Sequence, residues 1–135
     1  MLIRMCLARI VIVDSEEEKL SMIVLRELAG EHRAFPIMIG IHEAYAIDRR
    51  TKHHKMERPL THDLIANIFD ELGYKLERIV INELRESTFH AKLVLQHNGQ
   101  TLEVDSRPSD AIAIGAGTET PIYVDESVLD EVCRS

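Results

Sequence analysis

The chain has 135 residues, which is the length of one ordinary domain and enough to bury a core without disulfides or a structural metal. Apolar residues make up 45% and charged residues 29%, a globular balance that excludes a fibrous or disordered chain. The formal net charge of −7 excludes a protein that coats nucleic acid by bulk positive charge, and the longest apolar runs are too short to span a membrane.

The first forty residues predict three strands. Ile3–Val13 has the pattern of a long strand, and we expect its β-branched run, residues 10–13, to be buried on both faces. After a charged turn, Leu20–Arg26 forms the second half of a hairpin. A third strand, residues 34–39, contains Pro36, which cannot donate to a ladder. We therefore expect that strand at a sheet edge or at a bulge.

A helix that begins at Ile41 runs into a basic cluster. The residues of this basic cluster are Arg49, Arg50, Lys52, Lys55 and Arg58. Cations at a helix C-terminus complement the helix dipole, so one interpretation is a solvated helix end without a function. The other is a contact with nucleic acid or with another subunit.

A second helix is predicted from Thr61, which we expect to be its N-cap, to a stop at Gly73. Its first turn holds His62 and Asp63. The helix dipole disfavours a charged histidine there, so His62 is either a weakened base or a plain hydrogen-bonding residue. The apolar stripe expected to face the core consists of Leu64, Ile65, Ile68, Phe69 and Leu72.

Two strands, residues 75–82 and 89–96, come next, and Asn98-Gly99 predicts a tight hairpin turn into a further strand. Folding the chain about that turn pairs Leu95 with Leu102, Leu93 with Val104, and Lys92 with Asp105. The apolar residues then share one face of the hairpin. The polar residues of the other face are His90, Lys92, Glu103 and Asp105.

The segment Asp105–Ala111 joins this strand to an apolar helix that we expect from Pro108 to about Ala116, buried on all sides. Ser106 or Arg107 is the expected N-cap, and Asp110 falls in the first turn. A guanidinium beside free helix N–H groups can receive a phosphate. The alternative is a capped helix in which Arg107 pairs with Asp105 or Asp110 for structure.

A short strand at 121–124 and a helix at 125–132 complete the pattern. Paired strands interleaved with a few helices predict an α+β fold rather than a doubly wound parallel sheet. We expect a single domain over residues 1–135, with a mixed, mainly antiparallel sheet and three to four helices packed against it. Cys6 and Cys133 form no CxxC pair, and the N-terminus lacks a signal-peptide layout. We expect a cytoplasmic protein with two thiols, the alternative being a disulfide between the two ends of the chain.

Taken together, four stretches resemble the bifunctional nuclease (DNase/RNase) domain family in order and spacing. They are Phe35–Gly40 followed by Glu43-Ala44, then Arg58–Leu64, Asp105–Ala113 and Pro121–Val124. The resemblance implies an α+β domain that cleaves DNA and RNA and forms a homo-oligomer, with a dimer favoured. Plant members often carry a C-terminal UVR module, and we expect none in this chain.

On this resemblance we expect a nuclease that hydrolyses DNA and RNA with little sequence preference, assisted by Mg²⁺ or Mn²⁺. Such a reaction needs an activated water, neutralised charge at phosphorus and help for the leaving oxygen. Arg107 could clamp the phosphate and His62 could act as base or leaving-group acid. The candidates are His62, Asp63, Arg107 and Asp110 for catalysis, Glu43, Asp105 and Asp110 for metal binding, and the basic cluster for nucleic-acid binding.

The alternative is a non-catalytic domain for oligomeric assembly or ligand sensing. On that hypothesis the same charged groups hold the fold or a dimer together. The acidic balance of the chain favours this alternative, as does the lack of a catalytic triad or of metal-ligand spacing in the sequence.

Overall fold

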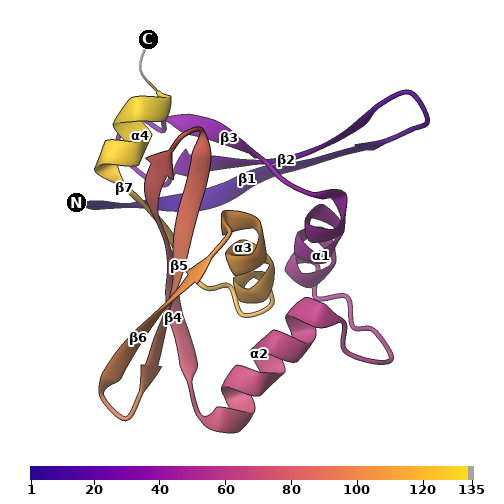
Figure 1. Cartoon of the computed structure of the whole chain (residues 1–135), viewed down its shortest axis with the longest axis vertical. Helices are drawn as coiled ribbons and strands as arrows, with labels where there is room; N and C mark the ends of the chain where they lie inside the picture. The colour runs from indigo at the N-terminus through magenta and orange to yellow at the C-terminus, as the bar shows by residue number, and fades with distance from the viewer. Residues whose placement is uncertain (134–135) are drawn as a thin grey trace.

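The computed structural model describes residues 1–133, which form one seven-stranded sheet and four helices (Figure 1). The strands are β1 (Leu2–Asp14), β2 (Lys19–Glu27), β3 (Ala34–Met38), β4 (Lys75–Arg85), β5 (Thr88–His97), β6 (Gln100–Ser106) and β7 (Ile122–Asp125). The helices are α1 (Ile41–Thr51), α2 (Thr61–Leu72), α3 (Pro108–Ala116) and α4 (Glu126–Val132). The predicted α+β fold is confirmed.

The sheet consists of two meanders joined by one central strand. Its strand order is β3-β2-β1-β7-β4-β5-β6, and only the β4–β7 pair is parallel. In Figure 1 the first meander runs across the picture while β4, β5 and β6 run steeply. The short strand β7 pairs with β1 on one side and with β4 on the other, so it alone connects the two meanders.

Local signals in the sequence set several features of the sheet. Pro36 lies in β3 at the sheet edge, as expected for a residue that cannot donate to a ladder. Asn98 and Gly99 both have positive φ, 49° and 78°, which a tight primed hairpin turn requires. The predicted register of the β5–β6 hairpin is confirmed, with Leu93 opposite Val104.

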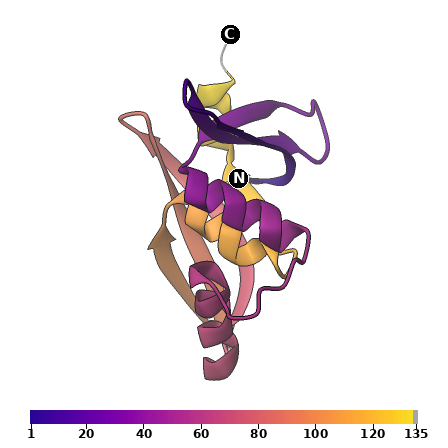
Figure 2. The same ribbon diagram turned by 90° about the vertical axis from the view of Figure 1, so that its right-hand side faces the viewer.

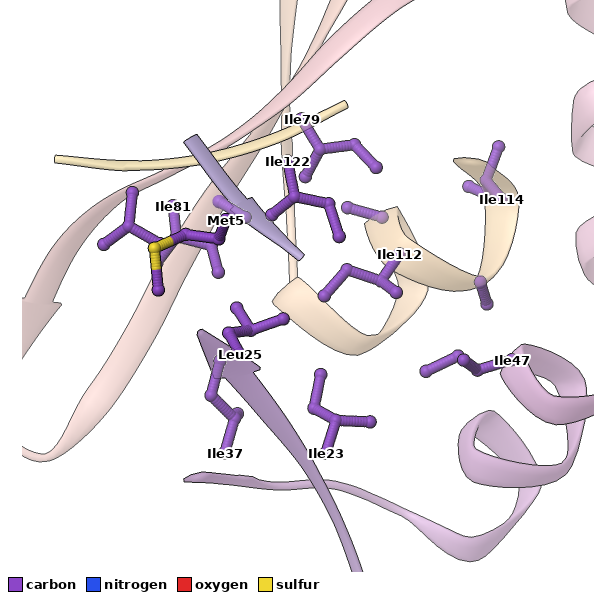
Figure 3. Close-up of a cluster of buried hydrophobic side chains, with 14 of the residues drawn as sticks. Met5, Ile23, Leu25, Ile37, Ile47, Ile79, Ile81, Ile112, Ile114 and Ile122 are labelled. Carbon is purple, nitrogen blue, oxygen red and sulfur yellow. The ribbon is translucent and has the colours of Figure 1, made fainter. Parts of the chain in front are cut away.

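Helix α3 lies at the centre of the core, between the sheet and α1 (Figures 1 and 2). Every one of its residues from Pro108 to Gly115 is buried except Asp110. Ile112 packs among Ile79, Ile122 and Leu25 in the close-up of Figure 3. Burying an isoleucine side chain stabilises a fold by about 1.5–3 kcal/mol, so this helix anchors the domain.

Two packing expectations were wrong. The run from Ile10 to Val13 is only half-buried, because the end of the β1–β2 hairpin projects beyond the rest of the molecule (Figure 1). Helix α2 has no buried residue, although Ile65 and Phe69 pack against the core. A separate observation is that strand β6, at the second edge of the sheet, leaves Leu102 and Val104 exposed.

Two further observations concern the cysteines and the length of the helices. Cys6 and Cys133 are both free thiols in the structure. Within residues 1–133, no helix has the length and apolar content needed to cross a membrane.

Candidate active site

The first turns of three helices meet at one point of the surface. Glu43 is the third residue of α1, His62 the second of α2 and Asp110 the third of α3, while Arg107 is the N-cap residue of α3. We call these four residues the Asp110 cluster. A helix N-terminus carries partial positive charge, so three of them together favour an anion at this point.

Asp110 is the centre of this cluster. Its Oδ1 lies 2.9 Å from Nε2 of His62, and its Oδ2 accepts from Nε and Nη2 of Arg107 at 2.9 and 2.8 Å. Nη2 of Arg107 also lies 3.9 Å from Oε2 of Glu43. The His62 side chain is only 12% exposed, whereas that of Arg107 is 66% exposed. The cluster therefore holds its histidine inside and presents its guanidinium to solvent.

The neighbours of Asp110 keep it ionised. Partial burial by itself raises the pKa of Asp110, but the hydrogen bonds from His62 and Arg107 and the charge of Arg107 outweigh it, so the pKa lies below its ordinary value. The same pair raises the pKa of Arg107. An ionised carboxylate only accepts hydrogen bonds, so Nε2 of His62 carries the proton in the 2.9 Å contact. In the neutral imidazole, Nδ1 then holds the free lone pair.

Gly40 gives Glu43 room to reach this cluster. The glycine ends the loop after β3 and is the N-cap residue of α1. A Cβ atom at this position would overlap Oε1 of Glu43. The backbone of Gly40 is extended with φ of −74°, so the absence of a side chain matters here for space and not for conformational freedom.

The cluster opens into a cleft of about 1410 Å³ between α1, α2 and β6, which we call the α2–β6 cleft. Asp105 lines it, is exposed, and makes no ion pair within residues 1–133. Leu64 and Val104 form part of its apolar wall. Arg107 also borders a second hollow of about 450 Å³ on its other side, beside β3 and the β4–β5 turn. The exposed guanidinium thus stands between two depressions of the surface.

Asp63 lies outside the Asp110 cluster. Its carboxylate accepts hydrogen bonds from Arg50 and from the backbone N–H of Leu60, at 3.0 Å for the latter, and pairs with Arg49 at 3.0 Å. Burial raises the pKa of Asp63, but the bond from Leu60 and the two guanidinium groups outweigh it and lower that pKa. Leu60, and not the predicted Thr61, is the N-cap residue of α2, since its backbone is extended (φ −86°, ψ −179°). The Asp63 carboxylate accepts a hydrogen bond from the N–H of Leu60.

Arg50 joins α1 to α3. Its guanidinium donates to the carbonyl oxygens of Ala113 and Ile114, at 2.7 and 2.8 Å, and to Asp63. These carbonyls belong to the last turn of α3, where they have no partner within the helix. The arginine is 9% exposed. Arg49 and Arg50 therefore hold three helices together, which is a structural task.

The remaining basic residues lie in the exposed loop after α1. Lys52 pairs with Asp48 at 3.1 Å, while Lys55 and Arg58 make no ion pair within residues 1–133. Lys55 lines a smaller pocket of about 360 Å³ together with Arg49. The basic cluster is thus divided into two structural arginines, the buried Arg50 and the partly buried Arg49, and three exposed cations.

The three predicted metal ligands all line the α2–β6 cleft, but within residues 1–133 no three His, Cys, Asp or Glu residues are placed to form a ligand set. Both oxygens of Asp110 are engaged by His62 and Arg107. Glu43 and Asp105 are the carboxylates left to hold a hard cation. Mg²⁺ is commonly bound by one or two carboxylates together with substrate phosphates, so the oxygen chemistry of these two residues is the kind that such a cation takes.

Sequence reasoning missed the roles of Gly40 and Arg50. A glycine three residues before an acidic residue at a strand–helix boundary is the only local signal for the first. No local signal exists for the second, because the carbonyl partners of Arg50 lie 63 and 64 residues away along the chain. The capping role of Asp63 had a signal in the sequence, since an acidic side chain at the third position of a helix often accepts a hydrogen bond from the N–H of the N-cap residue.

Comparison with known proteins gives the family. The sequence model of the bifunctional nuclease domain matches residues 23–135. An uncharacterised protein of Mycobacterium tuberculosis is 43% identical over 108 residues, which are 80% of this chain and 63% of that protein. The rice (Oryza sativa subsp. japonica) protein named Bifunctional nuclease 2 is 28% identical over 109 residues, which are 78% of this chain and 34% of that protein.

A second rice protein, named Bifunctional nuclease 1, is 24% identical over 109 residues and is matched over 33% of its length. The chain thus spans less than two thirds of the mycobacterial relative and about a third of the rice relatives. The family match covers most of the chain and includes all four residues of the Asp110 cluster. The chain therefore belongs to the bifunctional nuclease domain family.

Proposed function

We propose that the protein is a nuclease that hydrolyses phosphodiester bonds of DNA and RNA, with the Asp110 cluster as its active site. The observation that carries this proposal is an ionised aspartate that bridges a histidine and an exposed arginine where three helix N-termini meet. Membership of the bifunctional nuclease domain family and similarity to rice proteins of that name support the reaction class.

Arg107 binds the scissile phosphate in this proposal. Its Nη1 makes no hydrogen bond within residues 1–133, and its side chain is the most exposed of the cluster. Guanidinium groups form paired hydrogen bonds with phosphate oxygens, and the helix N-termini add to the positive potential. These groups recognise the backbone and not the bases, which is why little sequence preference is expected.

His62 moves the proton. Asp110 holds the Nε2–H tautomer, so Nδ1 can take a proton from the attacking water, as in other histidine–carboxylate pairs. The water oxygen bonds to phosphorus, and the bond from phosphorus to the leaving sugar oxygen breaks. The proton held by His62 passes to that oxygen, which completes the hydrolysis without a net change in the enzyme.

We also predict a divalent metal ion at this site. Glu43 and Asp105 would hold Mg²⁺ or Mn²⁺, and the cation would neutralise charge on the phosphate. The measurement is cleavage in EDTA, followed by addition of Mg²⁺. We expect EDTA to stop cleavage and Mg²⁺ to restore it. Full activity in EDTA would contradict the metal requirement and leave the roles of His62 and Arg107 standing.

The decisive experiment compares cleavage of end-labelled single-stranded DNA and RNA by the wild type and two variants. We expect Arg107→Ala to reduce cleavage about a hundredfold or more, the usual loss when one donor to a transition-state anion is removed. The matched control is Arg85→Ala, an arginine of similar exposure (62%) on β4. Because all proteins are purified in the same way, a contaminating nuclease would give the same cleavage in every sample. Full activity in a folded Arg107→Ala variant would overturn the proposal.

One observation favours a second candidate, a non-catalytic assembly domain. Asp63, Arg49 and Arg50 use their charges to hold helices together, and both oxygens of Asp110 are engaged within the chain. On this hypothesis Arg107→Ala changes stability and leaves any cleavage unchanged. The same cleavage assay therefore separates the two candidates.

A further inference from the structure

The second hollow beside Arg107 has the composition of a ligand site. It lies between β3, the turn from β4 to β5 and the start of α3, and we call it the β3 hollow. Its volume of about 450 Å³ is within the range of small-molecule sites, which are mostly apolar with a few placed polar groups. Pro36, Met38 and Phe89 form part of its apolar wall. Its polar side chains are those of Ser87, Thr88, Arg107 and Ser109.

Ser109 is a buried polar residue whose hydroxyl has no partner. The residue is 5% exposed and lines the β3 hollow. Within residues 1–133 its hydroxyl makes no hydrogen bond, although its chain neighbours Arg107 and Asp110 pair with each other. Burying a polar group costs free energy unless it is hydrogen-bonded. A buried hydroxyl that borders a hollow is therefore placed to bind a ligand there.

The start of α3 adds backbone donors beside this hydroxyl. Pro108, the first residue of the helix, has no N–H, and the N–H of Ala111 donates to the carbonyl of Arg107 at 3.1 Å. The N–H groups of Ser109 and Asp110 make no hydrogen bond within residues 1–133, and no side chain caps the helix. Free N–H groups at a helix N-terminus carry partial positive charge and bind phosphates.

The two depressions beside Arg107 differ in charge. The carboxylates of Glu43, Asp105 and Asp110 line the α2–β6 cleft. Among the described residues, no acidic side chain lines the β3 hollow, whose one charged lining group is the guanidinium of Arg107. The hollow therefore presents positive potential to a ligand, and a ligand that carries a phosphate is favoured there.

We propose that the β3 hollow binds the nucleotide next to the scissile phosphate, with the Ser109 hydroxyl and the start of α3 on the outer phosphate of that nucleotide. Arg107 lines both depressions, so a strand whose scissile phosphate lies on its guanidinium continues from the α2–β6 cleft into the hollow. The Cα atoms of Arg107 and Ser109 are two residues apart, at most about 7 Å, so one strand reaches both. The inference rests on the proposed function, which places the scissile phosphate at Arg107.

This path defines the substrate class. Met38 and Phe89 offer an apolar surface to the sugar and base of the bound nucleotide, and aromatic side chains stack on bases with little regard to sequence. A base held in a hollow cannot stay paired in a duplex. The substrate is therefore single-stranded nucleic acid with nucleotides on both sides of the cleaved bond.

The first test measures binding without cleavage. The probe is deoxyadenosine 3′,5′-bisphosphate, which carries two phosphates on one nucleotide and has no phosphodiester bond to hydrolyse. It is added to the nitrogen-labelled wild type, and the amide signals are followed by nuclear magnetic resonance. We expect the signals of Ser109, Asp110 and Met38 to shift. Deoxyadenosine, which has no phosphate, should leave the Ser109 signal in place.

Ser109→Ala removes the hydroxyl, and Ser21→Ala is its matched control. Ser21 is also 5% exposed, lies in β2 and lines neither depression. We expect Ser109→Ala to raise the dissociation constant of the bisphosphate about tenfold or more, the usual effect of losing a hydrogen bond to a charged group. Ser21→Ala should keep the wild-type affinity. Since the Ser109 hydroxyl has no partner within residues 1–133, alanine there should not lower the melting temperature.

A second pair of variants tests the wall of the hollow. Met38 is 60% exposed, so Met38→Glu places a negative charge beside the phosphate without burying it. We expect this variant to weaken binding of the bisphosphate as well. The matched control is Leu28→Glu, at a position that is 48% exposed and lines neither depression, and it should bind as the wild type does.

The second test measures cleavage of short strands. A dinucleotide with one phosphodiester bond is compared with the same dinucleotide carrying a further phosphate at its 5′ or its 3′ end. Only one side of the scissile bond lies in the hollow, so we expect one of the two phosphates to lower KM about tenfold. Ser109→Ala should remove most of this advantage, and Ser21→Ala should keep it.

The outcomes separate this inference from the proposed function. Cleavage by the wild type without a shift of the Ser109 signal overturns the inference alone. Equal dissociation constants for Ser109→Ala and Ser21→Ala overturn it too, as does a terminal phosphate that changes KM at neither end. A shift at Ser109 without cleavage of any strand overturns the proposed function, and the hollow is then a nucleotide-binding site without a flanking role.

Discussion

Asp110 joins two side chains that the sequence keeps apart. His62 lies 48 residues earlier in the chain and Arg107 only three, yet both donate to the same carboxylate. The aspartate uses its two oxygens for these side chains and not for the backbone of its own helix, which has no side-chain cap. A single residue thus sets the tautomer of the histidine and the direction of the guanidinium.

Asp110→Asn tests this residue. An amide carries no charge, and one of its two polar atoms is a donor that cannot accept from Arg107 or His62. We expect cleavage to fall by about a hundredfold to ten thousandfold, as for other histidine–carboxylate pairs. The measurement is kcat and KM on a labelled oligonucleotide, and we expect the loss mainly in kcat. If the loss of activity is explained entirely by a lower melting temperature of the variant, this prediction is wrong.

Gly40→Ala tests the position of Glu43. The added Cβ overlaps the Glu43 carboxylate, which can move because it ends a flexible side chain. We therefore expect little change in melting temperature and a measurable fall in cleavage. Gly99→Ala is the control, for which we expect lower stability and unchanged cleavage. Gly99 has φ of 78° in a hairpin turn, so alanine there is expected to cost about 1 kcal/mol of stability and leave cleavage unchanged.

At the scale of the elements, three helices are tied together by one partly buried ion pair. Arg50 of α1 binds Asp63 of α2 and the last carbonyl groups of α3. Helix α2 buries no residue of its own, so this tie and the packing of Ile65 and Phe69 fix its place. Since His62 is the neighbour of Asp63, the tie also places the histidine of the Asp110 cluster.

Asp63→Asn should therefore destabilise the fold in a pH-dependent way. The pKa of Asp63 is below its ordinary value, so its contribution is complete above about pH 4 and is lost as the pH falls through the folded-state pKa. We expect a loss of about 3 kcal/mol at pH 7, because Arg50 keeps a charge without its partner. Urea unfolding at pH 7 and pH 3 measures the difference, which should shrink in acid.

The control for this prediction is Asp70→Asn on the same helix. Asp70 is exposed and has no ion pair within residues 1–133, so we expect its replacement to change stability by less than about 0.5 kcal/mol at either pH. Equal losses for Asp63→Asn at pH 7 and pH 3 would contradict the role assigned to the ion pair.

The sequence predicts these elements well because their signals are local. Helix α3 begins and ends where Pro108 and the apolar run indicate, and the turn at Asn98 and Gly99 sets the β5–β6 register. The stripe of α2 was misjudged because periodicity finds an apolar side but does not say whether the chain's own core covers it. The bonds of Arg50 depend on how three helices cross, which no local pattern contains.

The candidate site was predicted in part, less completely than helix α3 or the β5–β6 hairpin and better than the bonds of Arg50. The predicted catalytic and metal-binding residues are Glu43, His62, Asp63, Asp105, Arg107 and Asp110. The structure brings four of them, all but Asp63 and Asp105, to one point. Asp63 is next to His62 in sequence but points elsewhere, since neighbours on a helix project about 100° apart. Sequence proximity is therefore a poor guide to which first-turn residues share a site.

At the scale of the whole molecule, the two meanders of the sheet depend on β7. Val124 is fully buried, and its strand pairs with Ile3 of β1 and Ile81 of β4. A chain that ends at Thr120 lacks this strand, so β1 and β4 each present an unpaired edge next to the core. We expect such a chain to lose cooperative thermal unfolding and to aggregate.

A chain that ends at Val132 keeps both β7 and α4 and is the control, for which we expect one cooperative transition. Differential scanning calorimetry compares the two. A cooperative transition in the shorter chain would show that the meanders fold without their connecting strand.

The central position of β7 also determines the order of events during synthesis. We expect the β1–β2–β3 meander and the β4–β5–β6 meander each to form as they emerge from the ribosome, because each consists of strands that are consecutive in the chain. Their joining has to wait for residues 122–125, which come after both. Until then the nascent chain exposes two open strand edges, the condition in which chaperones protect a polypeptide from pairing with its neighbours.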